Sequence, residues 1–389
     1  MENIKNKNKS DFYSKLSAAV VIIGILLRIY FSFVHTISGD SCWHYTASKF
    51  ISNEHRFPLF EQVGRDEPFW PPPLFHIIAA FFYSIFAESG LKLVPLIFGS
   101  LALVFSRKLF RKVLDERATF YSMLFLTFIP LSIDYSVLGY TESLLPFFTA
   151  TSIYFALDKK FVLSSVIAGL GVLAKYNGVF LIPVLLYLAY TKSERKDRTK
   201  NLLIVCIVPM LVGLPWFIRN FLELGNPLWP FLNFLFKGYL GSPRGSYSSI
   251  SLANLTSFAT YVSVYIGFFG IPDGIYSLLF FYKIPFINIL IALFFAGTLV
   301  FTGPLFFGSS KNKNKNKKAF YVLLGSFFVM FLIYEINATA EVSRIMLPVL
   351  IGAAFFYGIA MDKILSRFAT FSKLINIILA VALFAFASA

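Results

Sequence analysis

Long apolar runs follow one another along this chain, and short segments rich in lysine and arginine separate them. A helix needs about 20 apolar residues to cross the hydrocarbon core of a bilayer, and several runs reach or approach that length. Of the 389 residues, 57% are hydrophobic and only 14% are charged. A water-soluble domain cannot cover so much apolar surface with so few charges. The sequence therefore predicts an all-α, polytopic protein of the cell membrane.

The positions of the cationic loops predict the orientation. The net charge is +15, but the lysines and arginines lie in short loops between apolar runs, so we expect membrane topology rather than nucleic-acid binding to explain it. Residues 38–73 hold five acidic and three basic residues, which suits the outer face. Four strongly cationic segments are expected in the cytoplasm: 1–15, 107–117, 191–200 and 310–318.

These anchors fix the parity of the crossings and predict about eleven transmembrane helices. The number of crossings between 38 and 107 must be odd, and two apolar runs, 72–88 and 91–106, are available. We therefore expect 91–106 to cross the membrane and 72–88, which starts at the prolines at 71–73, to form an interfacial helix. The same parity makes the aromatic run 258–281 an interfacial or re-entrant element rather than a single crossing. The predicted spans are 16–37, 91–106, 118–134, 142–157, 161–174, 178–190, 201–218, 286–308, 319–336, 344–361 and 371–388.

The chain divides into three predicted parts. Residues 1–218 form a seven-span catalytic module that includes the outer loop 38–90. Residues 219–285 form an outer segment, and residues 286–389 form a C-terminal transmembrane module.

Two acids stand out in the first outer loop. Asp40 lies at the end of the first span, beside Trp43 and His44, where partial desolvation would make a carboxylate usable as a base. Glu67 lies beside Asp66 and a run of prolines, and is a second catalytic candidate if the loop folds back over Asp40. An ordinary solvated acid explains either residue equally well.

Four further residues are candidates for substrate binding at the same face. Tyr140 and Glu142 lie in the short outer loop before the predicted span 142–157, although Glu142 also suits a plain helix N-terminus. Lys175 and Arg344 are cations at outer span ends, against the usual charge bias, and together would suit a phosphate group. Snorkelling of Lys175 and pairing of Arg344 with Glu341 are the simpler alternatives.

A metal site remains open at this stage. His44 is a candidate substrate contact, and His55 and His76 are too distant in sequence to form a zinc motif with it. Asp40 and Glu142 would hold a divalent cation, magnesium or manganese, if the reaction uses one. No phosphate-binding loop, dinucleotide fingerprint or nucleophile elbow is present in the sequence.

The order of these motifs resembles that of the GT-C superfamily of membrane glycosyltransferases, in particular the protein O-mannosyltransferases and the lipid A aminoarabinose transferases. Asp40 is followed here by Ser41, where many relatives have a second acid, which leaves Glu67 or Glu142 for that role. The matching pieces are Asp40, Tyr45, Ala47, the Pro-Pro-Leu at 72–74, GVLAKYNG at 171–178, LPWFIRNFLELGNPLWPF at 214–231 and SRIMLP at 343–348.

The resemblance implies an activity and a site. A sugar would move from a polyprenyl-phosphate donor in the outer leaflet to an acceptor hydroxyl of a protein, lipid or cell-surface glycan, with inversion. Asp40 would act as the base, Tyr45 would contact the substrate, and cations such as Lys175 and Arg344 would hold the departing phosphate. Oligosaccharide transfer to asparagine ranks lower, because the Trp-Trp-Asp motif of those enzymes is missing from the sequence.

A transporter or flippase for an anionic lipid-linked substrate is the alternative function. Such proteins favour internal repeats and charged residues in the middle of spans. Here the unexplained charges gather at one expected face, which favours an enzyme.

Overall fold

The computed structural model describes residues 2–37, 39–61, 68–236, 313–336 and 347–367. Within these ranges the chain is helical apart from its connections and one isolated bridge between Phe60 and Pro68. The longer helices are α1 (Glu2–Val34), α2 (Asp40–Glu54), α3 (Leu74–Phe86), α5 (Leu93–Val113), α6 (Glu116–Phe128), α8 (Leu145–Leu157), α9 (Phe161–Ala174), α10 (Ile182–Lys192), α11 (Arg198–Leu224), α17 (Lys313–Ile336) and α19 (Val349–Arg367).

Four helical stretches of the described residues are long and apolar enough to cross a bilayer by length and composition. They are Ser10–Val34, Glu88–Val113, Arg198–Leu224 and Val349–Ser366. Two shorter apolar helices, α3 and α9, accompany them. The prediction of an all-α polytopic membrane protein is therefore confirmed, as is the helix expected over 72–88. Because 286–308 and 371–388 lie outside the described residues, as does the run 258–281, the count of eleven stays a prediction.

Prolines divide several predicted spans. The expected span 118–134 is α6 followed by the short helix α7 (Pro130–Asp134), with an extended residue, Ile129, between them. Proline has no N–H and suits the first turn of a helix, so the chain restarts there instead of continuing. The 3₁₀ turns η1 (Thr141–Leu144) and η2 (Tyr176–Leu181) likewise precede α8 and α10, each of which has a proline in its first turn.

A buried arginine in α1 stabilises the break between α6 and α7. The Arg28 side chain is fully buried, and its guanidinium donates to the carbonyl of Thr127 at 3.3 Å and to the hydroxyl of Ser132 at 2.8 Å. It also donates to the Ser136 hydroxyl at 2.9 Å and to the Gly24 carbonyl at 3.0 Å. A charge so deep in a membrane helix needs such partners, and Arg28 thereby ties α1 to the broken helix.

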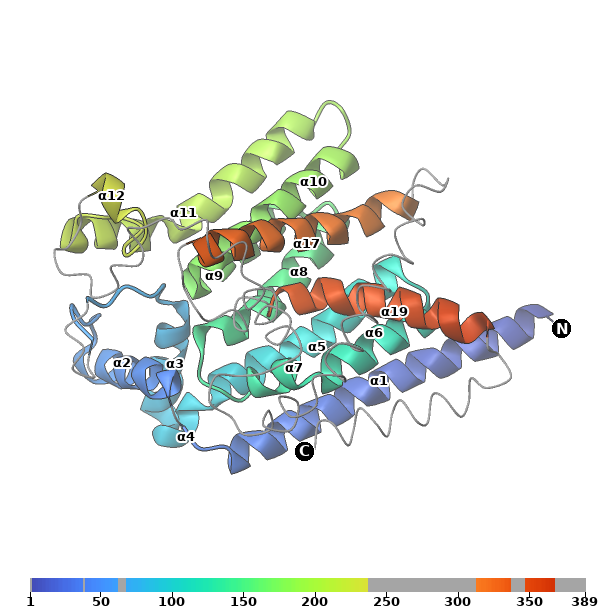
Figure 1. The fold of residues 1–389 in the computed structure, drawn as a ribbon, viewed down its shortest axis with the longest axis horizontal. Helices are drawn as coiled ribbons and strands as arrows, with labels where there is room; N and C mark the ends of the chain where they lie inside the picture. The colour runs from blue at the N-terminus through green and yellow to red at the C-terminus, as the bar shows by residue number, and fades with distance from the viewer. Residues whose placement is uncertain (1, 38, 62–67, 237–312, 337–346, 368–389) are drawn as a thin grey trace.

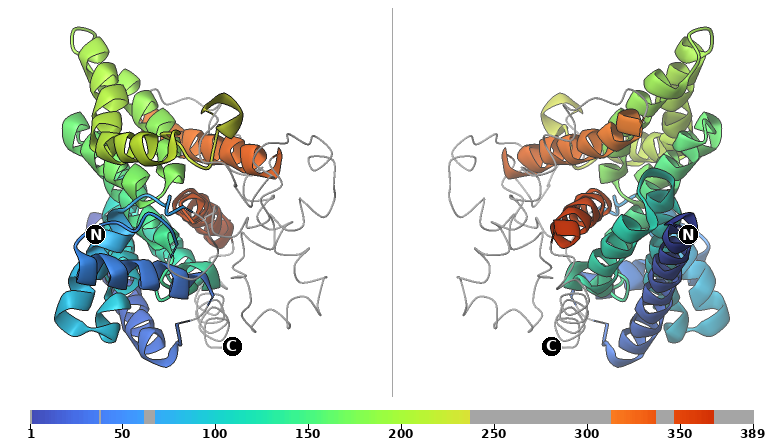
Figure 2. Two further views of the ribbon diagram at one scale, coloured as in Figure 1. Left: turned by 90° about the vertical axis from the view of Figure 1, so that its left-hand side faces the viewer. Right: turned by 90° about the vertical axis from the view of Figure 1, so that its right-hand side faces the viewer.

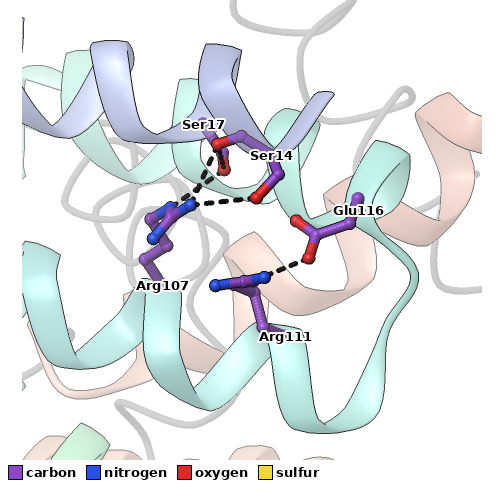
Figure 3. Close-up of polar contacts among 5 residues, drawn as sticks. All are labelled: Ser14, Ser17, Arg107, Arg111 and Glu116. Carbon is purple, nitrogen blue, oxygen red and sulfur yellow. Dashed lines mark hydrogen bonds and ion pairs between the residues drawn. The ribbon is translucent and has the colours of Figure 1, made fainter. Parts of the chain in front are cut away.

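One end of the helix bundle carries paired charges, and we call it the cationic end (Figure 3). Arg107 donates to the carbonyl of Ser14 at 2.9 Å, and Arg111 donates to Glu116 at 2.7 Å. Ion pairs of Lys112 with Asp158 and of Arg117 with Asp362 also lie here. The loops that join α5 to α6 and α8 to α9 therefore share one end of the bundle, as the charge argument predicts.

The opposite end, which we call the loop end, is built from α2, α3, the short helix α4 (Glu88–Leu91) and the segment 135–142. Figure 1 shows α2, α3 and α4 together, far from the N-terminus of α1. Lys92 donates to the carbonyl of His35 at 2.7 Å, so the start of α5 meets the end of α1 here. The sequence analysis gave bounds for one helix in this loop, 72–88, and α2 is a second helix of the same loop.

The C-terminal helices cover the N-terminal module from one side. α19 packs on α6, and α17 packs on α10 and on α19 (Figure 2). Phe320 of α17 and Phe355 of α19 stack with ring centroids 3.9 Å apart. The buried residues shared by these helices are mostly aliphatic and aromatic, with Thr119 and Ser122 of α6 buried among them.

Candidate functional site

Asp40 is the first residue of α2 and lies immediately after a sharp change of chain direction. Gly39 before it has φ of 58°, a conformation that glycine adopts without strain. The Asp40 side chain is half-buried. A side chain at position 39 would lie 3.6 Å from the hydroxyl of Tyr140. The turn therefore places the beginning of α2 against the segment that precedes α8.

The segment around Gly139 and Tyr140 packs on α2. The backbone N–H of Gly139 donates to the hydroxyl of Ser41 at 3.2 Å. The ring of Tyr45 occupies the space in which a side chain at position 139 would lie. Tyr140 packs edge-on against His44, with centroids 6.3 Å apart. Three of the predicted substrate contacts, His44, Tyr45 and Tyr140, thus lie together beside Asp40.

Tyr45 has a buried hydroxyl without a hydrogen-bond partner in the described part of the chain. Only 2% of this side chain is exposed, and burial raises the pKa of its hydroxyl. Buried polar groups are nearly always paired. The Tyr45 hydroxyl is an exception to this rule within the described residues.

Glu142 and Lys175 form an ion pair that joins η1 to the end of α9. The carboxylate of Glu142 is 1% exposed, while the ammonium-bearing side chain of Lys175 is 23% exposed. The other carboxylate oxygen of Glu142 accepts from the hydroxyl of Thr141 at 2.9 Å. Because Glu142 follows Tyr140 by two residues, the same segment that packs on α2 also holds Lys175.

The sequence analysis treated Lys175 as a cation that snorkels or binds phosphate, and Glu142 as a helix-terminal acid or a second acid of the site. In the structure, Glu142 and Lys175 instead form an ion pair with each other. An ammonium has three N–H donors, so binding to Glu142 leaves Lys175 with donors for a further anion. The pair is compatible with phosphate binding but does not establish it.

A histidine pair joins α2 to α3. Nδ1 of His44 is 3.0 Å from Nε2 of His76, which comes from α3. His76 was considered in the sequence only as part of a zinc motif and was not carried into the site. The sequence feature that could have indicated His76 is a single histidine in an otherwise apolar helix. A buried polar group in such a helix requires a partner.

The connection between α2 and α3 is attached to α11. Arg219 donates to the carbonyls of Phe69 at 2.7 Å and Pro58 at 3.1 Å. Asn220 donates to the hydroxyl of Tyr176 at 3.0 Å. These contacts place the Arg-Asn of the LPWFIRN stretch at the loop end, and sequence reasoning assigned no side-chain role to either residue.

Two predicted site residues, Glu67 and Arg344, lie outside the described residues, so their placement relative to Asp40 stays a prediction. A divalent cation was also left open. Within the described ranges, no three histidine, cysteine, aspartate or glutamate side chains gather as a metal site would require. Both oxygens of Glu142 already accept from donors. The residues in place therefore do not fit a resident metal held by Asp40 and Glu142.

Comparison with known proteins supports the resemblance. The family model described as dolichyl-phosphate-mannose-protein mannosyltransferase matches residues 70–219. ArnT from Cupriavidus metallidurans, solved with undecaprenyl phosphate, matches 90% of this chain with a TM-score of 0.56 and 15% identity. The chain has the fold of the GT-C membrane glycosyltransferases. No curated protein sequence matches it.

A second GT-C structure gives the same result. The archaeal oligosaccharyltransferase AglB from Archaeoglobus fulgidus, in complex with an inhibitory peptide and a dolichol-phosphate, matches 95% of this chain with a TM-score of 0.58 and 17% identity. The chain spans 59% of the length of the ArnT chain and 53% of the AglB chain. The family model includes Tyr140, Glu142 and Lys175 but begins after Asp40.

Proposed function

We propose that this protein is a glycosyltransferase that moves a sugar from a polyprenyl-phosphate donor to an acceptor hydroxyl at the extracytoplasmic face of the membrane. The observation that carries the proposal is the cluster at the loop end, where the segment 139–142 contacts the start of α2 on one side and holds Lys175 on the other. A carboxylate, a tyrosine hydroxyl and a cation are thereby gathered at one end of a GT-C fold. Both solved relatives were obtained in complex with a polyprenyl-type phosphate, undecaprenyl phosphate in ArnT and a dolichol-phosphate in AglB.

The chemistry requires one base and one anion-binding group. Asp40 removes the proton from the acceptor hydroxyl while the hydroxyl oxygen attacks the anomeric carbon of the sugar. The bond from that carbon to the phosphate oxygen breaks, and the lipid phosphate leaves with the electron pair. Attack from the face opposite the phosphate inverts the anomeric configuration. Lys175 offers its remaining N–H donors to the departing phosphate.

The other predicted residues have defined places in this scheme. Tyr45 and Tyr140 contact the sugar or the acceptor, and His44 lies next to both. Glu67 stays the candidate for a second acid and Arg344 the candidate for a second phosphate-binding cation. No step above depends on a divalent cation.

The transporter alternative finds little support in the described residues. A transporter is expected to have charged residues in the middle of its spans, and Arg28 is such a residue. The guanidinium of Arg28, however, donates to carbonyl and hydroxyl partners from α1, α6, α7 and the turn that follows α7. Its role is structural, which leaves the loop end as the site for function.

The activity test uses the purified protein in lipid nanodiscs. Undecaprenyl phosphate carrying mannose, glucose, galactose or N-acetylglucosamine serves as donor, with a serine- and threonine-rich peptide or a cell-envelope glycan fraction as acceptor. Mass spectrometry follows the release of undecaprenyl phosphate and the mass gained by the acceptor. Asp40→Asn is expected to lower turnover by about 10²–10⁴-fold, whereas Asp158→Asn, at the cationic end, is the matched control and keeps it.

Retained turnover in Asp40→Asn would remove Asp40 from the role of base. Addition of EDTA separates the metal-dependent and metal-free versions. Proton NMR of the glycosylated acceptor reports whether the anomeric configuration is inverted.

A separate test addresses the face of the membrane. Cys42 is exposed on α2, two residues from Asp40, and Cys206 lies within α11. In a Cys206→Ser background, a membrane-impermeant maleimide is expected to label Cys42 in intact cells. Labelling only after lysis would place the loop end in the cytoplasm and overturn the proposed orientation.

A further inference from the structure

Two histidines from different helices meet beside Asp40. Nδ1 of His44 lies 3.0 Å from Nε2 of His76, and both side chains are buried. Asp40 precedes His44 by four residues on α2, so both residues lie on the same helix face, one turn apart. The scheme proposed above gives the second histidine no role.

His76 lies among aromatic rings and is fully buried. Its ring centroid is 5.1 Å from that of Phe69 and 6.0 Å from that of Trp43. This burial lowers the pKa of His76 to about 3. His76 is therefore neutral at physiological pH, and a neutral imidazole can accept one hydrogen bond.

The contact between the two rings has a direct consequence for His44. When His44 carries a proton on both nitrogens, its Nδ1 N–H can donate to Nε2 of neutral His76. A hydrogen bond to the charged form favours that form. The same bond fixes the orientation of the His44 ring and leaves Nε2 as the nitrogen that gains or loses a proton.

We propose that His44 receives the proton that Asp40 removes from the acceptor hydroxyl, and that His76 is a positioning residue that holds His44 for this transfer. This inference rests on the proposed glycosyltransferase function. As the acceptor oxygen bonds to the anomeric carbon and the phosphate leaves, the proton passes to Asp40. It then passes to Nε2 of His44 and from there to water, which returns Asp40 to its ionised form for the next turnover.

The surroundings of His44 suit this role. Asp40 lies one turn before it on the same helix, His76 contacts it from α3, and Tyr140 packs against it from the segment before α8. Lys49, the cation further along α2, forms an ion pair with Glu88 of α4. A positive charge on His44 is thus placed near a carboxylate.

The first test reads the histidines directly and needs no substrate. The chain has four histidines, so ¹⁵N-histidine labelling in nanodiscs yields four side chains, which single variants assign. His76 is expected to stay neutral between pH 8 and pH 5. In His76→Phe, which keeps an aromatic ring in the cluster, His44 is expected to lose its single tautomer and to take up its proton at a lower pH.

Matched variants separate a positioning role from general damage. His76→Gln keeps a group that accepts from His44 and is expected to restore much of the wild-type ¹⁵N pattern. His55→Gln changes the exposed histidine at the end of α2 and is expected to leave His44 unchanged. Identical His44 signals and titration in wild type and His76→Phe would overturn the proposal.

The second test measures turnover with the undecaprenyl-phosphate hexoses described above. His76→Phe is expected to lower kcat about tenfold, to leave KM for the donor within about twofold, and to shift the acid limb of the pH profile, since general acid–base steps contribute about 10²–10⁴-fold in total. His76→Gln is expected to recover part of the loss. If His44→Phe and His76→Phe were fully active while Asp40→Asn was inactive, the proposed role of the histidine pair would be wrong and that of Asp40 would stand. Full activity of Asp40→Asn would rule out Asp40 as the base, and the proposed mechanism with it.

Discussion

The two ends of the helix bundle both carry ionised side chains, but these side chains differ in how far they are exposed to solvent. At the cationic end, Lys112 and Asp158 remain 25% and 38% exposed while they pair. At the loop end, Glu142 is only 1% exposed where it meets Lys175. Charged side chains that stay hydrated cost little free energy, and they set the membrane topology. Buried charges cost several kcal/mol unless their partners are in place, so a bundle that retains them at one end is expected to use them there.

The largest effect is expected when one partner is removed from the buried pair of Glu142 and Lys175. Glu142→Leu leaves Lys175 without its carboxylate and is expected to lower the free energy of unfolding by about 3–5 kcal/mol. Titration with SDS in mixed micelles measures this change. The double variant Glu142→Leu with Lys175→Met is expected to recover most of the loss. A single variant as stable as the wild type would show that the pair is solvated like those at the cationic end.

The second test uses pH. Burial lowers the pKa of folded His76 to about 3 from 6.5, so the unfolded state binds more protons between these values. Stability is therefore fully present above pH 6.5 and is lost as the pH falls toward 3, by about 1.4 kcal/mol for each pH unit. Unfolding of wild type and His76→Phe between pH 7 and pH 4.5 compares the two slopes. Equal slopes would mean that His76 is not held neutral.

The third test concerns the contact between α2 and the segment before α8. In Gly139→Ala the new methyl group would overlap the ring of Tyr45, and such overpacking is expected to cost about 1–3 kcal/mol. Gly325→Ala is the control, because nothing lies within 4 Å of a side chain added there and the position is inside a helix. Thermal unfolding in detergent is expected to lower Tm in the first variant and to raise it slightly in the second.

The smallest effect is expected at the cationic end. Asp158→Asn breaks the half-exposed pair with Lys112 and is expected to change the free energy of unfolding by about 1 kcal/mol or less. Because salt screens exposed charges, the difference from wild type should shrink further between 50 mM and 500 mM NaCl. A loss as large as that of Glu142→Leu would abolish the distinction between the two ends.

The sequence by itself determined the membrane class and the helix after the prolines at 71–73, because these follow from local composition and from the fixed thickness of a bilayer. It also indicated Asp40, since an acid at a span end needs no distant partner to be noticed. α2 was missed because its sequence is mixed polar and aromatic and lacks the apolar run that identified the other helices.

Only the tertiary structure decided which polar groups meet. Glu142 and Lys175 are 33 residues apart, His44 and His76 are 32 apart, and Arg28 reaches Ser136 across 108 residues. Each pair forms because burial removes water from one side chain and thereby requires a partner. A sequence shows that a polar residue lies in an apolar run, but the packing of separate helices determines which residue satisfies it.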